Sequence, residues 1–418
     1  MIFRSGFFIL LVLTFLSFRS FGSDTLTLTL HQADSIFLTN NYYLLAASMN
    51  VEAQKAKILQ AKLYPNPTFT ADINFYDPQN DKWFHAGKTG QKSFQLEQLI
   101  TLSGKRKSEI ELARINADIA LLEFQDLVRQ LKFRLHKNLF ALGQQQQLLT
   151  KYNTQLALLD SLMSGYESQV RNGNMPLKDF IRLKSEYLEL NNDRADVLKE
   201  YFEAQADIQT LLQASQTIVF RFSDNEISSY IKIKDLEELI TSARTHHPYL
   251  QISRENKKLA HTYLRYQKQM AVPEINLFSY YDQRGGAFDN QINTGLSVPL
   301  PIWNRNQGNV KAAQYEIKEA EYQLNAREQE LLANLRNSYQ LYMHTVKEYQ
   351  KASRLYDKDF ELILKGVYDN FQKRNISLLE FVDFFEAYNE AVTELARIKT
   401  QLVTSAEQLN LNIGIDVY

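Results

Sequence analysis

The sequence predicts a mostly helical protein with a small β part, built from two tandem copies of one plan: helix, strand, strand, very long helix, helix. The chain of 418 residues holds only 14 glycines and 8 prolines, a low content that favours long uninterrupted helices. Two segments, 103–165 and 308–370, contain no proline, and as α-helices each would be roughly 90 Å long. No compact domain needs a helix of that length.

The tandem plan rests on an internal repeat. Four segments of the first half recur in the same order in the second half, with offsets between 200 and 208 residues. They are 40–44 with 246–250, 62–67 with 270–275, 97–109 with 297–309, and 170–180 with 371–381. We therefore place the first copy at 23–220 and the second copy at 221–418.

The first copy opens with a helix expected over 30–63, which Tyr64-Pro65-Asn66-Pro67 ends because proline cannot continue a helix. Residues 68–76 then alternate apolar and polar side chains, which predicts a strand with one apolar face. The later elements of this copy are a strand near 93–101, the long helix 103–165 and a helix–turn–helix tip at 170–178. The matching elements of the second copy are strands near 274–282 and 291–299, the long helix 308–370 and a tip at 372–379.

Both long helices carry an apolar seam whose steps are mostly three and four residues, in the same register in each copy. Its positions are Ile110, Ala113, Ala117, Ala120, Phe124, Leu127 and Leu131, and then Val310, Ala313, Ile317, Ala320, Leu324 and Leu331. A mean spacing near 3.5 residues predicts coiled-coil packing, in which alanine allows close approach. The alternative is an ordinary amphipathic helix on a globular core, which the helix length and the shared register disfavour.

The N-terminus has the layout of a secretory signal peptide. Residues 1–22 place a cation at Arg4 before the apolar run 7–16, and small residues follow at Ser20 and Gly22. The apolar run is too short to span a bilayer, which makes a retained membrane anchor the weaker alternative. No other stretch approaches the ~20 consecutive apolar residues of a transmembrane helix. We expect an exported chain without a helical membrane span.

Cysteine content and charge exclude several functions. The chain has no cysteine, so it forms no disulfide and offers no acceptor for N-terminal lipidation. Removal of Arg4 and Arg19 with the signal peptide leaves 45 of the 47 basic residues against 48 acidic residues. This nearly neutral balance gives no support for nucleic-acid binding.

The sequence holds no constellation typical of an enzyme. Its seven histidines are scattered, and the adjacent pair His246-His247 does not share a helix face on which to bind a metal. We find neither a phosphate-binding P-loop nor a GxSxG nucleophile motif. We therefore expect no catalytic, cofactor-binding or metal-binding residues.

Four short strands are too few to close a barrel in lipid, where open sheet edges are not tolerated. They form either a small soluble sheet or one share of a barrel, and three chains would supply twelve strands. Aromatic residues near the strand ends, such as Tyr64, Trp83 and Trp303, fit a membrane-interface belt as well as the core of a soluble sheet. The export signal and the length of the helices favour the membrane.

Four motifs in the chain resemble a known family, the outer-membrane efflux proteins or TolC-like outer-membrane factors. The motifs are LYPNPTF (63–69), NGNMPLKDF (172–180), SVPLPIWNRNQGNVKAAQYEI (297–317) and RNISLLEFVDFFEA (374–387). A strand that ends in Pro-Leu-Pro before an aromatic residue and Asn-Arg-Asn-Gln-Gly is most similar to the branch that serves heavy-metal efflux pumps of the resistance-nodulation-division type. The resemblance extends from about Leu26 to Ile415.

The resemblance implies an architecture and a role. It implies a homotrimer with a twelve-stranded β-barrel in the outer membrane, continued by a periplasmic α-helical coiled-coil tunnel. Such a protein is a passive conduit in a tripartite pump and exports heavy-metal cations or drugs. Its partners are a periplasmic adaptor protein and an inner-membrane transporter of the resistance-nodulation-division type. The elbows at 97–109 and 297–309 are then the places where strands leave the outer-membrane lipid.

The same resemblance places Trp303 at the level of the lipid headgroups, with Tyr64 and Trp83 as further membrane-interface candidates. Three cations of the elbows are then expected in the aqueous or phosphate region, with a solvated helix start as the alternative. These cations are Lys105, Arg106 and Arg305.

Proteins of the family narrow their tunnel at the tips, where acidic side chains ring the pore. The tip motif places these acids at Glu380 and Asp383, which share a helix face and in a trimer favour cation passage. The matching residues of the first copy are Asp179 and Arg182, and Arg182 is expected to pair with a carboxylate and latch the closed state. Surface charge on a coiled-coil tip is the alternative for all four residues.

Two features depart from many relatives. No cysteine follows the signal peptide, which leaves anchorage to the barrel alone, and the first elbow lacks the prolines of the second. A periplasmic coiled-coil scaffold or adaptor protein is the competing function, and an exported enzyme is a more distant one. Adaptors of that kind have one helical hairpin flanked by β-rich domains, whereas this chain has two hairpins, each with a strand pair.

Overall fold

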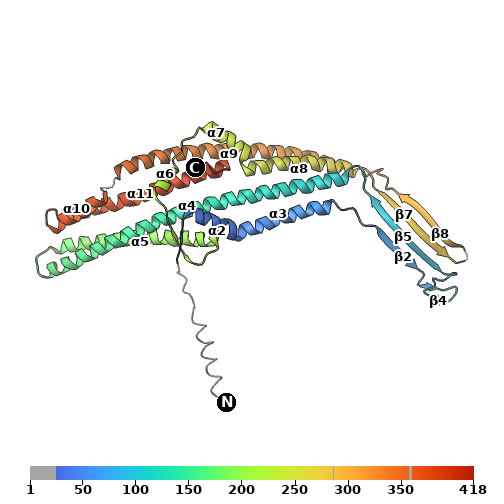
Figure 1. Ribbon diagram of the computed structural model, residues 1–418, viewed down its shortest axis with the longest axis horizontal. Helices are drawn as coiled ribbons and strands as arrows, with labels where there is room; N and C mark the ends of the chain where they lie inside the picture. Colours follow the sequence, from blue (N-terminus) through green and yellow to red (C-terminus); the bar gives the residue numbers. More distant parts are fainter. Residues whose placement is uncertain (1–24, 286, 357–359) are drawn as a thin grey trace, which may run out of the picture. The chain divides into compact units, whose positions relative to one another are not determined.

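The computed structural model describes residues 25–285, 287–356 and 360–418 (Figure 1). They form two compact units, which we call the sheet unit (46–127 and 241–333) and the tip unit (25–45, 128–240 and 334–418). The expected signal peptide, residues 1–22, lies outside the described residues. Among the helices that the structure describes, none is long and apolar enough to cross a membrane.

The sheet unit contains a four-stranded antiparallel sheet. Its strands, in their order across the sheet, are β2 (Thr68–Ile73), β5 (Gln91–Ile100), β7 (Ile275–Arg284) and β8 (Phe288–Ser297). The central pair joins the two expected copies, because β5 belongs to the first and β7 to the second, and they pair over ten positions from Gln91↔Arg284 to Ile100↔Ile275. A small hairpin of β3 (Tyr76–Asp77) and β4 (Lys82–Trp83) occupies the connection between β2 and β5.

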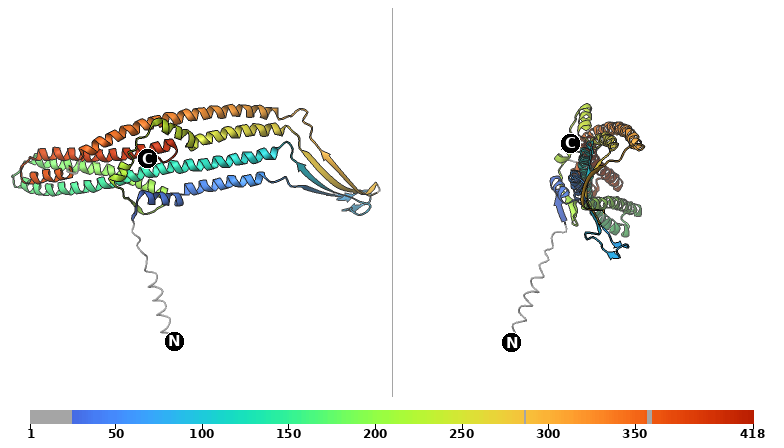
Figure 2. Two further views of the ribbon diagram at one scale, coloured as in Figure 1. Left: turned by 45° about the horizontal axis from the view of Figure 1, so that its top comes forward. Right: turned by 90° about the vertical axis from the view of Figure 1, so that its right-hand side faces the viewer.

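Four helices run side by side in the sheet unit, and each is joined to one strand of the sheet (Figures 1 and 2). They are α3 (Tyr42–Ala61), α4 (Lys105–Arg171), α8 (Pro248–Met270) and α9 (Gln307–Leu355). No position of the expected apolar seam is exposed, and Ala117, Ala120 and Ala313 are buried. The small side chain of alanine lets these helices approach their neighbours closely.

The prediction of one uninterrupted helix over 30–63 is wrong. The chain forms α2 (Leu30–Asn40) and then α3, with a break at Asn41. Asn41 is extended (φ −65°, ψ 117°) and fully buried. Its Oδ1 accepts from the backbone N–H of Leu44 at 3.1 Å, and its Nδ2 donates to the carbonyl of Leu211 at 2.8 Å. The side-chain amide thus caps a helix start in the interior.

The second copy breaks at the matching residue, His247, with the same φ of −65° and ψ of 117°. This residue separates α7 (Leu236–His246) from α8, and it is also buried. The later long segment, expected as one helix over 308–370, is described as α9 and α10 (Phe360–Gln372). Residues 357–359 between these helices lie outside the described part of the chain.

The tip unit holds two helical hairpins, α4 with α5 (Leu177–Leu212) and α10 with α11 (Leu378–Ile413) (Figure 2). Their apolar faces share one core, in which Leu183 and Leu190 of α5 and Phe381 and Phe385 of α11 are buried. The unit also contains α6 (Asp224–Ser229) and a parallel pair of short strands, β1 (Thr25–Leu28) with β6 (Thr217–Phe220). The packed hairpins position the side chains at the two turns.

Candidate functional site

Each tip is a tight turn that is built in the same way in both hairpins. The turn between α4 and α5 has Gly173 in the left-handed region (φ +73°), and the turn between α10 and α11 has Arg374 there (φ +62°). In each turn the following residue, Asn174 or Asn375, donates its backbone N–H to the carbonyl five residues earlier, at 2.9 Å. This bond closes the end of the preceding helix. The turns therefore hold the next helix starts in defined positions.

Glu380, a gate candidate, is tied to the start of α11. Its carboxylate accepts hydrogen bonds from the backbone N–H and the Oγ of Ser377, at 2.7 and 2.8 Å, and completes a capping box. These bonds lower the pKa of Glu380, which keeps its carboxylate charged at neutral pH. Glu380 therefore has a role in its own helix besides any role in a pore.

The other three gate candidates also lie near the helix starts that follow the turns. Asp383 is exposed one turn after Glu380, Asp179 is half-buried in the first turn of α5, and Arg182 is exposed one turn later. The structure brings these residues to the tips, as expected from the motif. Their arrangement in a ring of several chains stays a prediction, and so does the pairing of Arg182 with a carboxylate.

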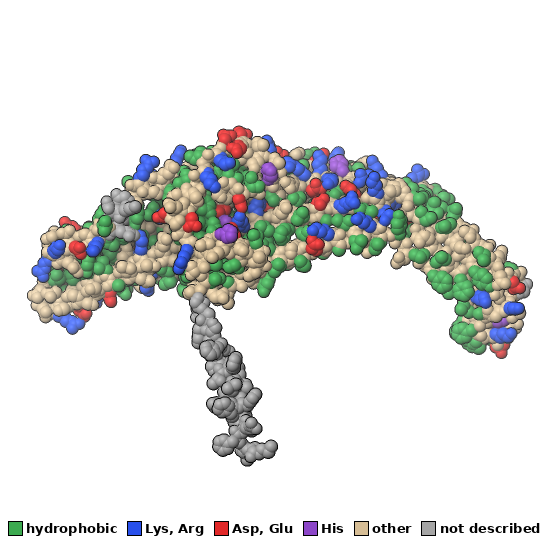
Figure 3. Space-filling view, in the orientation of Figure 1, with side chains coloured by type: hydrophobic (Ala, Val, Ile, Leu, Met, Phe, Trp, Pro, Cys, Tyr) green, Lys and Arg blue, Asp and Glu red, His purple; other side chains and the backbone are tan. Residues whose placement is uncertain are grey.

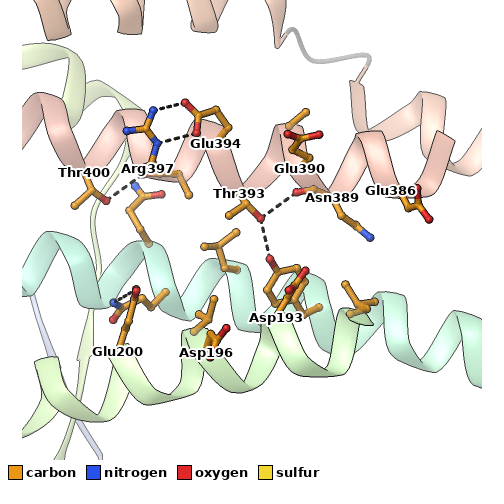
Figure 4. Close-up of a pocket in the computed structure, with 18 of the residues that line it drawn as sticks. Asp193, Asp196, Glu200, Glu386, Asn389, Glu390, Thr393, Glu394, Arg397 and Thr400 are labelled. Atoms are coloured by element: carbon orange, nitrogen blue, oxygen red, sulfur yellow. Dashed lines mark hydrogen bonds and ion pairs between the residues drawn. The ribbon is translucent and has the colours of Figure 1, made fainter. Parts of the chain in front are cut away.

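An acidic cavity of about 1060 Å³ lies behind the tips, between α4, α5 and α11 (Figure 4). Eight carboxylates line it: Glu186, Glu189, Asp193, Asp196 and Glu200 from α5, and Glu386, Glu390 and Glu394 from α11. The one basic residue in the described lining, Arg397, donates from Nε to Glu394 at 2.7 Å. The cavity therefore carries a strong negative charge.

This cavity was not predicted, although the sequence carries a signal for it. The acids of α5 recur in steps of 3, 4, 3 and 4 residues, and those of α11 in two steps of 4. Such spacing places all acids of a helix on one face. The acidic face of an amphipathic helix normally contacts water. The sequence therefore does not show that the acidic faces of α5 and α11 line one cavity; only the packing of the two helices does.

Glu186 is the most buried acid of the cavity. The residue is 4% exposed, and one of its carboxylate oxygens lies within 4.8 Å of one of Glu386. Burial, together with the nearby carboxylate of Glu386, raises the pKa of Glu186 to about 8.

The three membrane-interface candidates lie at the two ends of the sheet. Tyr64 precedes β2 and Trp303 follows β8, so both belong to the elbow end, whereas Trp83 lies in the small hairpin beyond the other end of β2. Trp303 is 86% exposed, the guanidinium of Arg106 lies 3.8 Å from the ring centre of Tyr64, and Trp83 packs against Phe75. Aromatic side chains thus stand at both ends of the strands.

Of the three elbow cations, Lys105 differs from the expectation of a solvated side chain, whereas Arg106 is partly exposed and Arg305 is exposed. Lys105 is buried, and its Nζ lies 3.2 Å from Glu274 Oε1. Arg106 donates from Nε to the carbonyl of Lys62 at 3.1 Å, and Arg305 donates from Nε to the carbonyl of Pro301 at 3.3 Å. These bonds fix the elbows because they tie each strand–helix connection to the backbone or to a neighbouring acid.

One face of the sheet is apolar and exposed, and Figure 3 shows hydrophobic side chains gathered over the strands. Pairing aligns Ala71, Phe94, Tyr281 and Ile292 in one row across the four strands. The adjacent row on the other face consists of Thr70, Gln95, Tyr280 and Asn293. Ile292 is 73% exposed. The sheet therefore has one face suited to lipid and a more polar face suited to water.

Solved structures share this fold. CusC, whose structures concern transmembrane channel formation, aligns with a TM-score of 0.75 over 92% of both chains at 15% identity. The CmeC outer membrane channel of Campylobacter jejuni aligns with a TM-score of 0.74 over 92% of this chain and 85% of its own, at 12% identity. In sequence, residues 239–414 match the family model of the outer membrane efflux protein.

Residues 239–414 are thus similar to the outer membrane efflux proteins. Proteins of this family are outer-membrane channels. A sequence relative is the cobalt-zinc-cadmium resistance protein CzcC of Cupriavidus metallidurans, 22% identical over 291 residues. The aligned part is 68% of this chain and 66% of CzcC, just under two thirds of the length of CzcC.

Proposed function

We propose that this chain is the outer-membrane channel component of a tripartite efflux pump and acts as a passive trimeric conduit. The sheet carries the proposal, because it has an exposed apolar face and, among the described residues, unpaired outer edges on β2 and β8. The apolar face costs free energy in water, and the unpaired edges cost free energy in lipid. Both costs disappear when copies of the sheet join edge to edge in a closed barrel within a membrane.

Three copies of the four-stranded sheet supply twelve strands. In this barrel the row with Phe94 and Ile292 faces lipid and the row with Gln95 and Asn293 faces the lumen, the alternation of outer-membrane barrels. The aromatic residues at both strand ends then stand at the two membrane interfaces. The four helices joined to the strands continue the barrel as a periplasmic tunnel.

We assign heavy-metal cations as the first substrate class and hydrophobic drugs as the second. The likeness to CzcC and the second elbow motif support the metals. A periplasmic adaptor protein and an inner-membrane resistance-nodulation-division transporter complete the proposed pump. They supply the energy, since this chain carries no nucleotide-binding motif.

The first test is the oligomeric state and conductance of the full-length protein in mild detergent. We expect a trimer by size exclusion with light scattering, and a gel band that shifts to the monomer only after heating. In planar lipid bilayers the trimer should give discrete conductance steps. A monomer without conductance would refute the conduit.

The substrate assignment needs its own test, namely deletion of the gene followed by challenge with zinc, cobalt, cadmium, copper, silver and hydrophobic drugs. We expect metal sensitivity that the reintroduced gene reverses. Sensitivity to drugs alone would refute the metal assignment and leave the conduit intact.

Membrane fractionation separates the conduit from the competing periplasmic scaffold or adaptor. A heat-modifiable trimer in the outer-membrane fraction is expected for the conduit, and a protein that salt washes remove is expected for the scaffold. The exposed apolar face of the sheet disfavours the scaffold, because such a face in water promotes aggregation.

A further inference from the structure

Three of the eight carboxylates in the acidic cavity converge on one point. Glu186, Glu189 and Glu386 each offer an oxygen, and these oxygens lie within 4.8 Å of one another. Two of the residues come from α5 and one from α11, so the cluster bridges the two hairpins of the tip unit. We propose that this cluster binds a divalent cation, Ca²⁺ by its chemistry, and that the ion holds α5 to α11.

The cluster lacks a positive partner on the protein. Arg397 is the one basic residue of the described lining, and its guanidinium already binds Glu394. Glu186 is buried, whereas Glu189 and Glu386 are exposed, and the three neighbouring carboxylates repel one another. Burial, together with this crowding, raises the pKa of Glu186. A bound divalent cation neutralises the same charge without requiring a proton on Glu186.

One buried amide oxygen in the same cavity lacks a donor. Asn389 is 7% exposed, and its Oδ1 has no hydrogen-bond partner among the described residues. Figure 4 shows the side chain of Asn389 pointing from α11 into the cavity, one turn along the helix from Glu386. A buried acceptor without a donor is costly, and a cation next to the three carboxylates would satisfy it.

The donor atoms select the class of cation. The described lining offers carboxylate, amide and hydroxyl oxygens and no histidine, and oxygen ligands suit hard cations such as Ca²⁺, Mg²⁺ and Mn²⁺. Oxygens on opposite sides of Ca²⁺ lie roughly 4.6–5.2 Å apart, whereas those of Mg²⁺ lie only about 4 Å apart. The oxygens of the cluster lie within 4.8 Å of one another, which both spacings allow. Mg²⁺ loses its waters reluctantly and demands near-ideal octahedral geometry, so a cluster of several protein carboxylates suits Ca²⁺ better. The surrounding cavity has room for the waters that complete its shell.

This site is separate from the proposed conduit. It lies within one chain and needs neither a trimer nor a membrane, and it does not include the gate candidates Glu380 and Asp383. Its expected effect is to stiffen the connection between α5 and α11 just behind the tips. The binding and conductance experiments can therefore fail independently.

The test is calorimetric titration of the full-length protein in detergent with CaCl₂ after dialysis against a chelator. We expect one saturable Ca²⁺ site per chain, weaker binding of Mg²⁺, and a thermal unfolding midpoint that rises with Ca²⁺. Glu186→Gln and Glu386→Gln should each lower the Ca²⁺ affinity at least tenfold. Glu203→Gln, an exposed acid of α5 outside the cavity, is the matched control and should bind as the unsubstituted protein does.

A double variant, Glu380→Gln with Asp383→Asn, distinguishes the cavity from the tips and should retain the site. The proposal is overturned when the unsubstituted protein shows no saturable Ca²⁺ binding at millimolar concentration. It is equally overturned when the triple variant of Glu186, Glu189 and Glu386 to Gln binds Ca²⁺ with undiminished affinity. Circular dichroism checks that each variant is folded. The triple variant should be stable, because glutamine removes the repulsion between the three carboxylates.

Discussion

His136 on α4 and Glu407 on α11 are joined in the interior of the tip unit, with Nδ1 of the imidazole 2.7 Å from Oε1 of the carboxylate. The other ring nitrogen lies 2.8 Å from Asp34 Oδ1, so one histidine connects α2, α4 and α11. Burial lowers the pKa of His136, but the bonds to Asp34 and Glu407 outweigh burial and raise it to about 9. The histidine is therefore cationic at neutral pH.

This cationic histidine predicts a pH dependence of stability. The pKa of His136 rises from 6.5 in the unfolded chain to about 9 in the folded chain, so its stabilisation is complete below pH 6.5. It should decrease as the pH rises toward 9, by at most about 3 kcal/mol. Thermal unfolding of the detergent-solubilised protein between pH 6 and 10 measures the change.

His136→Gln is the control for this prediction. Glu186 also has a raised pKa and titrates in both proteins, so the difference between the two pH profiles isolates the histidine. Identical profiles would show that the histidine is neutral in the folded chain.

The buried hydrogen bonds of Asn41 predict that a single substitution at the α2–α3 break lowers the free energy of unfolding by a large amount. Asn41→Leu leaves the N–H of Leu44 and the carbonyl of Leu211 without partners in the interior. Each unsatisfied group should lower the free energy of unfolding by about 1–3 kcal/mol. Asn40→Leu, at the exposed neighbouring residue, should change the free energy of unfolding far less. Equal unfolding midpoints for the two variants would contradict the role of the amide.

The gate proposal predicts a change in selectivity without a loss of folding. In Glu380→Gln with Asp383→Asn, cation selectivity and block by divalent ions in planar bilayers should both weaken, because the carboxylate ring is gone. Glutamine also serves in a capping box, so the start of α11 should survive. Unchanged selectivity and unchanged block in a folded trimer would exclude these two acids from the gate.

The barrel proposal predicts that the two faces of β8 respond differently to charge. Ile292→Arg puts a cation on the proposed lipid face and should cost about 2–4 kcal/mol if this row lies near the middle of the membrane. Asn293→Arg, on the opposite face, should be nearly neutral. The effect of each substitution is measured as the fraction of heat-modifiable trimer in outer-membrane extracts. Equal trimer yields from the two variants would argue against a lipid-facing row.

The sequence predicted the helical character, the sheet strands and the tips, because proline, alternation and long unbroken periodicity act within one segment. It did not predict the break at Asn41, since that break depends on the distant carbonyl of Leu211. The acidic cavity was missed for a similar reason. Glu186 and Glu386 are two hundred residues apart, and each alone is typical of a solvated helix face.

The pairing of β5 with β7 has a consequence for the order of events during biosynthesis. When the first half of the polypeptide emerges, β2 and β5 form a two-stranded ribbon, which is at best marginally stable in water. The strand that must flank β5 is made only after the whole first helical hairpin and the connection that follows it. The nascent chain therefore waits with an unfinished ribbon whose edges are unpaired, and chaperones that shield such segments should be needed most in that interval.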